Sequence, residues 1–133
     1  VVSQSIIEFE KKRHSSFSVD YYESPEHVAP INIGTIKGGE WHSTVPESVI
    51  AEGRLGVFPG ESVSNARMAF SEHLKEVSAS DSWLKENPPI LEWFEGQFES
   101  GKTDVDHAII NNLEDLNSFM NTKNLYNQIS ILR

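Results

Sequence analysis

The sequence lacks cysteine, has few basic residues and contains no long apolar run. Without cysteine the chain has no disulfide, no thiolate nucleophile and no cysteine-containing metal site. Only 11 Lys and Arg stand against 20 Asp and Glu, and the net charge of −9 argues against nucleic acid or anionic membranes as partners. No apolar run approaches the ~20 residues of a membrane span, and no signal-peptide pattern is present. We therefore expect a soluble, cytoplasmic protein.

The residues that are present are sufficient for one folded domain. The chain has 133 residues, of which 38% are hydrophobic and 10% aromatic, and this composition argues against a wholly disordered chain. Its length matches a single domain of ordinary size. The chain opens at Val1 and enters helical spacing at once, so we expect it to be a piece of a longer protein.

Apolar residues recur at helical spacing in three segments. The first predicted helix spans residues 1–13 and buries the stripe Val2, Ile6, Phe9 and Arg13. The second spans 62–77, with Ser62 as its N-cap and an end at the serines of 78–82. The third spans 105–116 and is predicted to begin at the cap Asp104.

Three other segments have the pattern of β-strands. Residues 31–37 are rich in β-branched side chains and end at Gly38-Gly39, which permits a turn with positive φ. Residues 47–58 alternate over a long stretch, which predicts an antiparallel strand with one face on a core. Residues 90–94 predict a further strand.

The order of these elements indicates an α+β fold. Helix, strand, strand, helix, strand and helix follow one another, as in a βαββαβ unit that lacks its first strand. We therefore predict a ferredoxin-like two-layer sandwich, in which two helices cover one face of an antiparallel sheet.

Motifs for catalysis are absent from the sequence. The five histidines form neither an HExxH nor a His-x-Asp motif, and no GxSxG or Gly-rich phosphate loop occurs. His73 and Glu76 lie three residues apart on one predicted helix face, but two ligands do not make a metal site, and a solvated polar face is the favoured interpretation. The residues alone therefore indicate an α+β domain with no catalytic and no metal-binding residues.

The segment 31–60 carries a family-like pattern. An N-x-G-x-I-x-G-G strand is followed by a hydrophobic-Pro pair and by a strand with an arginine before a Pro-Gly turn. These features are Asn32, Gly34, Ile36, Gly38, Gly39, Val45, Pro46, Arg54, Pro59 and Gly60. The pattern resembles the lid, or dimerisation, domain of the metallohydrolases that include acetylornithine deacetylase, succinyl-diaminopimelate desuccinylase, aminoacylase and glutamate carboxypeptidase.

The resemblance implies a division of the chain and a parent enzyme. Residues 1–100 resemble the lid, and 101–133 would begin the helical return to the catalytic domain, although 117–133 do not look like the family. The parent would hydrolyse N-acyl or peptide amides with two divalent metals, zinc or cobalt. In the family the metal ligands lie outside the lid, so this chain would hold no cofactor itself. The histidine of the family's lid would precede Val1.

Four residues are candidates for the substrate-facing surface. Ser43 stands where the family commonly has Asn, and Gln97 lies where the family often has a carboxylate-binding arginine, a stronger partner than an amide. Arg54 matches a family position, but pairing with Glu52 or a neighbouring strand would explain it equally. His42 would face a cleft at the strand turn or simply be a solvated turn residue.

The strand after the first helix is predicted to be an edge of the sheet. An edge has unpaired N–H and C=O groups, which a twin strand across a two-fold axis would satisfy. We therefore predict a homodimer through this strand and the first helix. The predicted edge residues are Ile31, Asn32, Ile33, Gly34, Thr35, Ile36 and Lys37.

Two alternatives remain open at this point. The Gly-Gly and Val-Pro pairs are also what any β-hairpin would contain. The chain would then be a stand-alone ferredoxin-like regulatory or protein-interaction module with no enzymatic parent.

Overall fold

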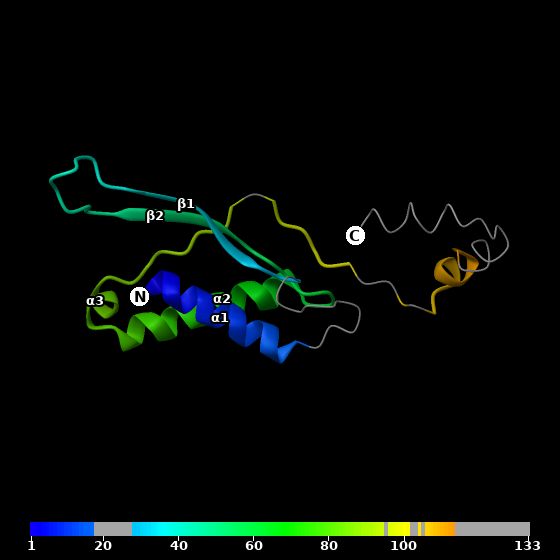
Figure 1. Cartoon of the computed structure of the whole chain (residues 1–133). Coiled ribbons are helices and arrows are strands. Elements are labelled where there is room, and N and C mark those ends of the chain that lie inside the picture. Colours follow the sequence, from blue (N-terminus) through cyan, green and yellow to red (C-terminus); the bar gives the residue numbers. More distant parts are fainter. Residues whose placement is uncertain (18–27, 95, 102–103, 105, 114–133) are drawn as a thin grey trace. The chain divides into compact units, whose positions relative to one another are not determined.

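The computed structural model is an α+β fold in which two helices pack together and against a two-stranded antiparallel sheet. It describes residues 1–17, 28–94, 96–101, 104 and 106–113. The chain divides into two units, Val1–Gly101 and Lys102–Arg133. In the first unit the order is α1, β1, β2, α2 and α3 (Figure 1).

Helix α1 spans Val2–Ser16, close to the prediction. Phe9 and Arg13 of the predicted stripe are buried, whereas Val2 and Ile6 are partly buried against the same core. The helix ends where Ser15 Oγ and Ser16 Oγ each donate to the carbonyl of Lys12 at 2.8 Å. Both hydroxyls thus bond back to the same carbonyl group within the last turn of the helix.

Helix α2 spans Val63–Ser80 and begins as predicted, because Ser62 Oγ accepts a hydrogen bond from Asn65 N at 3.2 Å. The predicted break over 78–82 is wrong for its first three residues. Ser78 stays helical, with its hydroxyl donating to the carbonyl of Leu74 at 2.7 Å. An unpredicted short helix, α3, spans Ser82–Glu86, because the carboxylate of Asp81 accepts from Trp83 N and Leu84 N.

The core lies where α1 and α2 meet the sheet. The rings of Phe9 and Phe70 pack edge to face, with centroids 5.6 Å apart, and Leu74 completes the buried cluster. Ile31 and Leu55 of the sheet pack on this cluster. Each fully buried side chain of this kind stabilises the fold by about 1.5–3 kcal/mol.

The sheet is a hairpin of β1, Ile31–Gly38, and β2, Val49–Leu55. Its register runs from Ile31 opposite Leu55 to Gly38 opposite Val49, with an irregularity between Ile33 and Thr35. The turn begins at Gly39, whose φ of 77° favours glycine, so the predicted function of the Gly38-Gly39 pair as a turn is confirmed. The strand predicted over 47–58 is shorter, and Phe58 instead enters the core with 0% of its surface exposed.

Only one end of the hairpin covers the core. Ile31 and Leu55 contact the helices, but farther along the same face Ile36 and Val49 are 66% and 61% exposed. Figure 1 shows the hairpin diverging from the helices toward its tip. The prediction of one face on a core is therefore right near Leu55 and wrong toward the tip.

The strand predicted over residues 90–94 does not form. Its apolar side chains behave as expected, since Leu91 packs on the core cluster and Trp93 contacts Phe70, with ring centroids 6.1 Å apart. Its backbone, however, forms no hydrogen bond with the backbone of any other described residue. A strand needs a hydrogen-bonded partner about 4.8 Å away, and the described part of the chain offers this segment none.

In the second unit, residues 108–113 are helical. The predicted cap is wrong, because Asp104 Oδ1 accepts from Asp106 N before the helix, while His107 Nδ1 accepts from Ile109 N at 3.2 Å. Residues 106 and 107 of the helix predicted over 105–116 are not helical, whereas 105 and 114–116 lie outside the described residues, as do 117–133.

A buried ion pair joins α1 to the loop before α2. Arg13 Nη2 lies 2.6 Å from Glu61 Oε2, and both side chains are at most 10% exposed. Arg13 also donates to the carbonyl of Gly56 at 3.0 Å, and Glu61 accepts from Phe58 N at 2.9 Å. The guanidinium lies over the ring of Phe58, 4.9 Å from its centroid. The predicted apolar stripe of α1 thus ends on a charged residue that is paired.

Among the helices of the described residues, none has the length and apolar character that crossing a bilayer requires.

Candidate functional site

A groove of about 720 Å³ lies between β2, α2 and the extended segment after α3, which lines it with residues 91–94 and 96–100. Its floor is apolar and is formed by side chains from both helices, the hairpin and the extended segment. These floor residues are Ile6, Ile31, Leu55, Phe70 and Leu91. The groove therefore combines a hydrophobic base with walls of largely exposed chain.

Two of the four predicted substrate-facing residues line this groove. Arg54 comes from β2, and Gln97 comes from the extended segment. His42 and Ser43 do not line it, since they are exposed in the turn between the strands, where the His42 ring lies 4.6 Å from that of Trp41. The structure thus brings Arg54 and Gln97 to one groove and leaves the other two residues at the hairpin tip.

Arg54 is not paired with Glu52, although that pair was one expectation. Glu52 instead accepts a hydrogen bond from Thr35 Oγ1 at 2.8 Å and lies 3.6 Å from Lys37 Nζ. Arg54 forms no ion pair with any residue that the structure describes.

The environment of Glu52 keeps its carboxylate charged. The hydroxyl of Thr35, and then the ammonium of Lys37, lower the pKa of Glu52 below its ordinary value. The Glu52 side chain is 43% exposed, so salt in the solvent screens the attraction between its carboxylate and Lys37.

The sequence did not predict the contact between Arg67 and Trp93. The Arg67 guanidinium lies over the Trp93 ring, 4.9 Å from its centroid, and both residues line the groove. Such a contact contributes about 0.5–1 kcal/mol at an exposed site. Leu91 and Trp93 are two residues apart, so an extended backbone puts both side chains on one face of the segment. Nothing in the sequence indicated which helix these side chains would contact.

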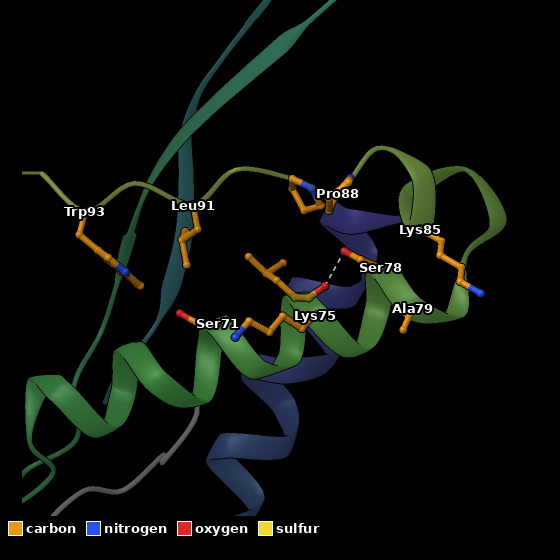
Figure 2. Close-up of a pocket in the computed structure, with 10 residues that line it drawn as sticks. Ser71, Lys75, Ser78, Ala79, Lys85, Pro88, Leu91 and Trp93 are labelled. Atoms are coloured by element: carbon orange, nitrogen blue, oxygen red, sulfur yellow. Dashed lines mark hydrogen bonds between the residues drawn. The ribbon is translucent and has the colours of Figure 1, made fainter.

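A second cavity, of about 570 Å³, lies between the C-terminal half of α2, α3 and residues 88–93 (Figure 2). Its hydroxyl groups are engaged by their own helix, since Ser71 donates to the carbonyl of Arg67 and Ser78 to that of Leu74. Figure 2 shows Lys75 and Lys85 extending in opposite directions, so their charges do not converge. This cavity has no arrangement of polar groups that would hold an anion.

His73 lies at the interface of the two helices and not on a solvated face, so that interpretation of it is wrong. Its ring stacks on Phe9, with centroids 4.7 Å apart, and its Nε2 is 2.9 Å from the carbonyl oxygen of Ser5. Over the described ranges, no three His, Cys, Asp or Glu side chains come together as a metal site would require.

Comparison with known proteins gives no match, whether to a protein-family model, to a curated protein or to a solved structure. The function of the groove and of the hairpin therefore has to be inferred from their own residues and from the sequence resemblance.

Proposed function

We propose that this chain is the dimerisation and substrate-covering lid of a metal-dependent amidohydrolase or exopeptidase of the N-acyl amino acid deacylase type. Its fold would be a ferredoxin-like sandwich without the first strand. The observation that carries the proposal is the outer edge of β1, which pairs with no described strand and is almost wholly exposed.

The outer edge of β1 is suited to pairing with a copy of itself. Gly56 N donates to the carbonyl of Pro30 at 2.9 Å, which makes these two opposite residues a hydrogen-bonded pair. Such pairs alternate along an antiparallel ladder, and the count follows β2 because the irregularity between Ile33 and Thr35 places its extra residue in β1. Five residues before Gly56, Ala51 therefore forms a non-hydrogen-bonded pair with Ile36. The backbone N–H of Ile36 therefore points away from β2.

Two copies related by a two-fold axis would join these edges into one four-stranded sheet. The exposed side chain of Ile36 would then have apolar neighbours across the axis. Helix α1 contacts β1, and its Ile7 is 45% exposed, so the two α1 helices would contribute apolar surface to the same interface.

If the chain is a lid, Arg54 and Gln97 would bind the carboxylate group of the substrate. Arg54 offers a guanidinium with no ion pair among the described residues, and a guanidinium binds a carboxylate with two parallel hydrogen bonds. Two divalent metals, zinc or cobalt, would activate water in a catalytic domain of the parent.

Dimerisation predicts a specific effect of proline. Ile36→Pro removes the outward N–H of β1 without removing a bond to β2, and it is expected to convert the dimer to a monomer. Ala51→Pro, the matched change on the opposite strand, is expected to leave the dimer intact. Sedimentation velocity over a range of concentrations measures both. A monomeric unsubstituted chain at high concentration would contradict the proposed dimer.

The enzymatic parent is tested separately by its coding sequence. The reading frame before the Val1 codon is expected to encode a strand with a histidine, preceded by segments with His-x-Asp and adjacent Glu-Glu. Mixed with zinc or cobalt and N-acetylated amino acids, the chain alone is expected to show no turnover. The proposal is contradicted by an in-frame stop codon directly before Val1. It is also contradicted by measurable turnover of the chain alone.

The alternative is a stand-alone regulatory or protein-interaction module. The exposed apolar side chains at the hairpin tip favour it, above all Val45, which is 93% exposed. The same coding sequence separates the two, because an interaction module needs no metal-ligand segments before Val1.

A further inference from the structure

The start of β1 is held by a side chain of α1. The carboxylate of Glu10 accepts a hydrogen bond from Ile31 N, with Glu10 Oε1 2.7 Å from that nitrogen. Both residues are half-buried, and α1 contacts β1 elsewhere as well. The first backbone N–H group of β1 is therefore already bonded within the fold of its own chain.

The N–H of Ile31 is one of those that β1 directs away from β2. Ile31 follows Pro30, whose carbonyl accepts from Gly56 N, so Ile31 stands at a non-hydrogen-bonded position of the ladder. Its bond to Glu10 agrees with that outward direction. The same alternation, counted along β2 past the irregularity, gives the further outward-facing residues of β1, which are Ile33, Ile36 and Gly38. Glu10 thus occupies the first of the outward positions.

The outward positions of β1 match those of a second copy related by two-fold symmetry. A two-fold axis can place Ile33 of one copy opposite Ile36 of the other. The same axis then places Ile31 opposite Gly38. At that last position Glu10 Oε1 occupies the place of the second copy's carbonyl oxygen, so Ile31 has no N–H left to donate. Charged side chains commonly protect the edges of sheets in this way.

We propose that Glu10 confines the pairing between two copies of β1 to the segment Ile33–Ile36 and excludes it from Ile31. Glu10 is a positioning residue, because it acts through the backbone of Ile31 and sets the length and the register of the joined sheet. The dimer is then weaker than the full length of β1 would allow. This inference rests on the proposed dimer and names the part of the edge that the second copy uses.

Hydrogen exchange of the unsubstituted chain tests the inference without a variant. It is measured residue by residue with NMR, below and above the concentration at which the dimer forms. The amides of Ile33 and Ile36 are expected to exchange several-fold more slowly in the dimer, because they gain partners there. The amide of Ile31 is expected to exchange at the same rate in both states, because Glu10 bonds it in both.

Glu10→Ala is expected to open Ile31 to the second copy. The dissociation constant of the dimer, measured by sedimentation velocity, is expected to fall by roughly fivefold or more, the effect of about one added hydrogen bond. Exchange at Ile31 then becomes dependent on concentration. Ile36→Pro in the Glu10→Ala background is expected to abolish the association, which assigns it to β1.

Two further variants separate the hydrogen bond from the charge. Glu10→Gln keeps an oxygen that accepts from Ile31 N and is expected to behave as the unsubstituted chain does. Glu8→Ala removes the same charge from α1 at a carboxylate that accepts from Gln4 of the same helix. It is expected to change the dissociation constant by less than about twofold, since an exposed charge contributes little.

Two results overturn this inference while the dimer stands. One is exchange at Ile31 that slows on dimerisation of the unsubstituted chain, and the other is an equal dissociation constant for Glu10→Ala and Glu8→Ala. An unsubstituted chain that stays monomeric contradicts the proposed function. In that case self-association of Glu10→Ala still supports the assignment of Glu10 as the residue that protects the edge, and a monomeric Glu10→Ala refutes it.

Discussion

Replacing Arg13 by methionine is expected to lower the free energy of unfolding by about 3–5 kcal/mol, the usual cost of removing one partner of a buried ion pair. The Glu61 carboxylate, at most 10% exposed, would lose the guanidinium 2.6 Å away and keep the N–H of Phe58 as a donor. The carbonyl of Gly56 would lose its donor as well. Denaturant unfolding followed by circular dichroism measures the change.

A control variant and a double variant separate the effect of the lost charge from the effect of lost packing. Arg54→Met, at an exposed arginine of β2, is expected to change stability by less than about 0.5 kcal/mol. Glu61→Gln in the Arg13→Met background is expected to recover part of the loss, because a neutral amide oxygen can still accept from Phe58 N. Equal effects of Arg13→Met and Arg54→Met would contradict the assignment of Arg13 as a buried, paired charge.

Replacing Phe58 by alanine is expected to cost about 3–5 kcal/mol, as for other large-to-small changes at fully buried aromatic residues. Phe58 is 0% exposed and stacks on Phe17, with ring centroids 4.2 Å apart. It also contacts His14 edge to face at 5.4 Å and lies beneath the Arg13 guanidinium. The cavity would therefore separate the end of α1 from the loop that follows β2. Thermal and denaturant unfolding measure this loss.

Phe98 is the matched control for Phe58. It is 83% exposed, so Phe98→Ala is expected to change stability by less than about 0.5 kcal/mol. Phe58→Leu, which leaves a smaller cavity, is expected to fall between the two. Similar losses for Phe58→Ala and Phe98→Ala would mean that Phe58 does not fill a closed core.

Only part of the candidate site was predictable from the sequence. Arg54 and Gln97 were chosen on a resemblance, and the structure places both in one groove, but it leaves His42 and Ser43 in an exposed turn. The contact of Arg67 with Trp93 was missed. It joins a helix to a segment 26 positions later, and the spacing within either segment carries no information about the other.

The sequence by itself determined the elements whose causes are local. Apolar spacing gave α1 and α2, the hydroxyl of Ser62 gave the start of α2, and Gly38-Gly39 gave the hairpin turn. Each of these features depends on contacts within a few residues, so the local sequence is enough to predict it.

Only the tertiary structure decided the features that join distant residues. Arg13 is paired with Glu61, 48 residues later. The segment 90–94 has the composition of a strand but is not one, because backbone pairing requires a neighbour that no local pattern supplies. The same missing neighbour leaves the edge of β2 open and creates the groove. Helices are determined largely within their own turns, whereas a strand exists only with its partner.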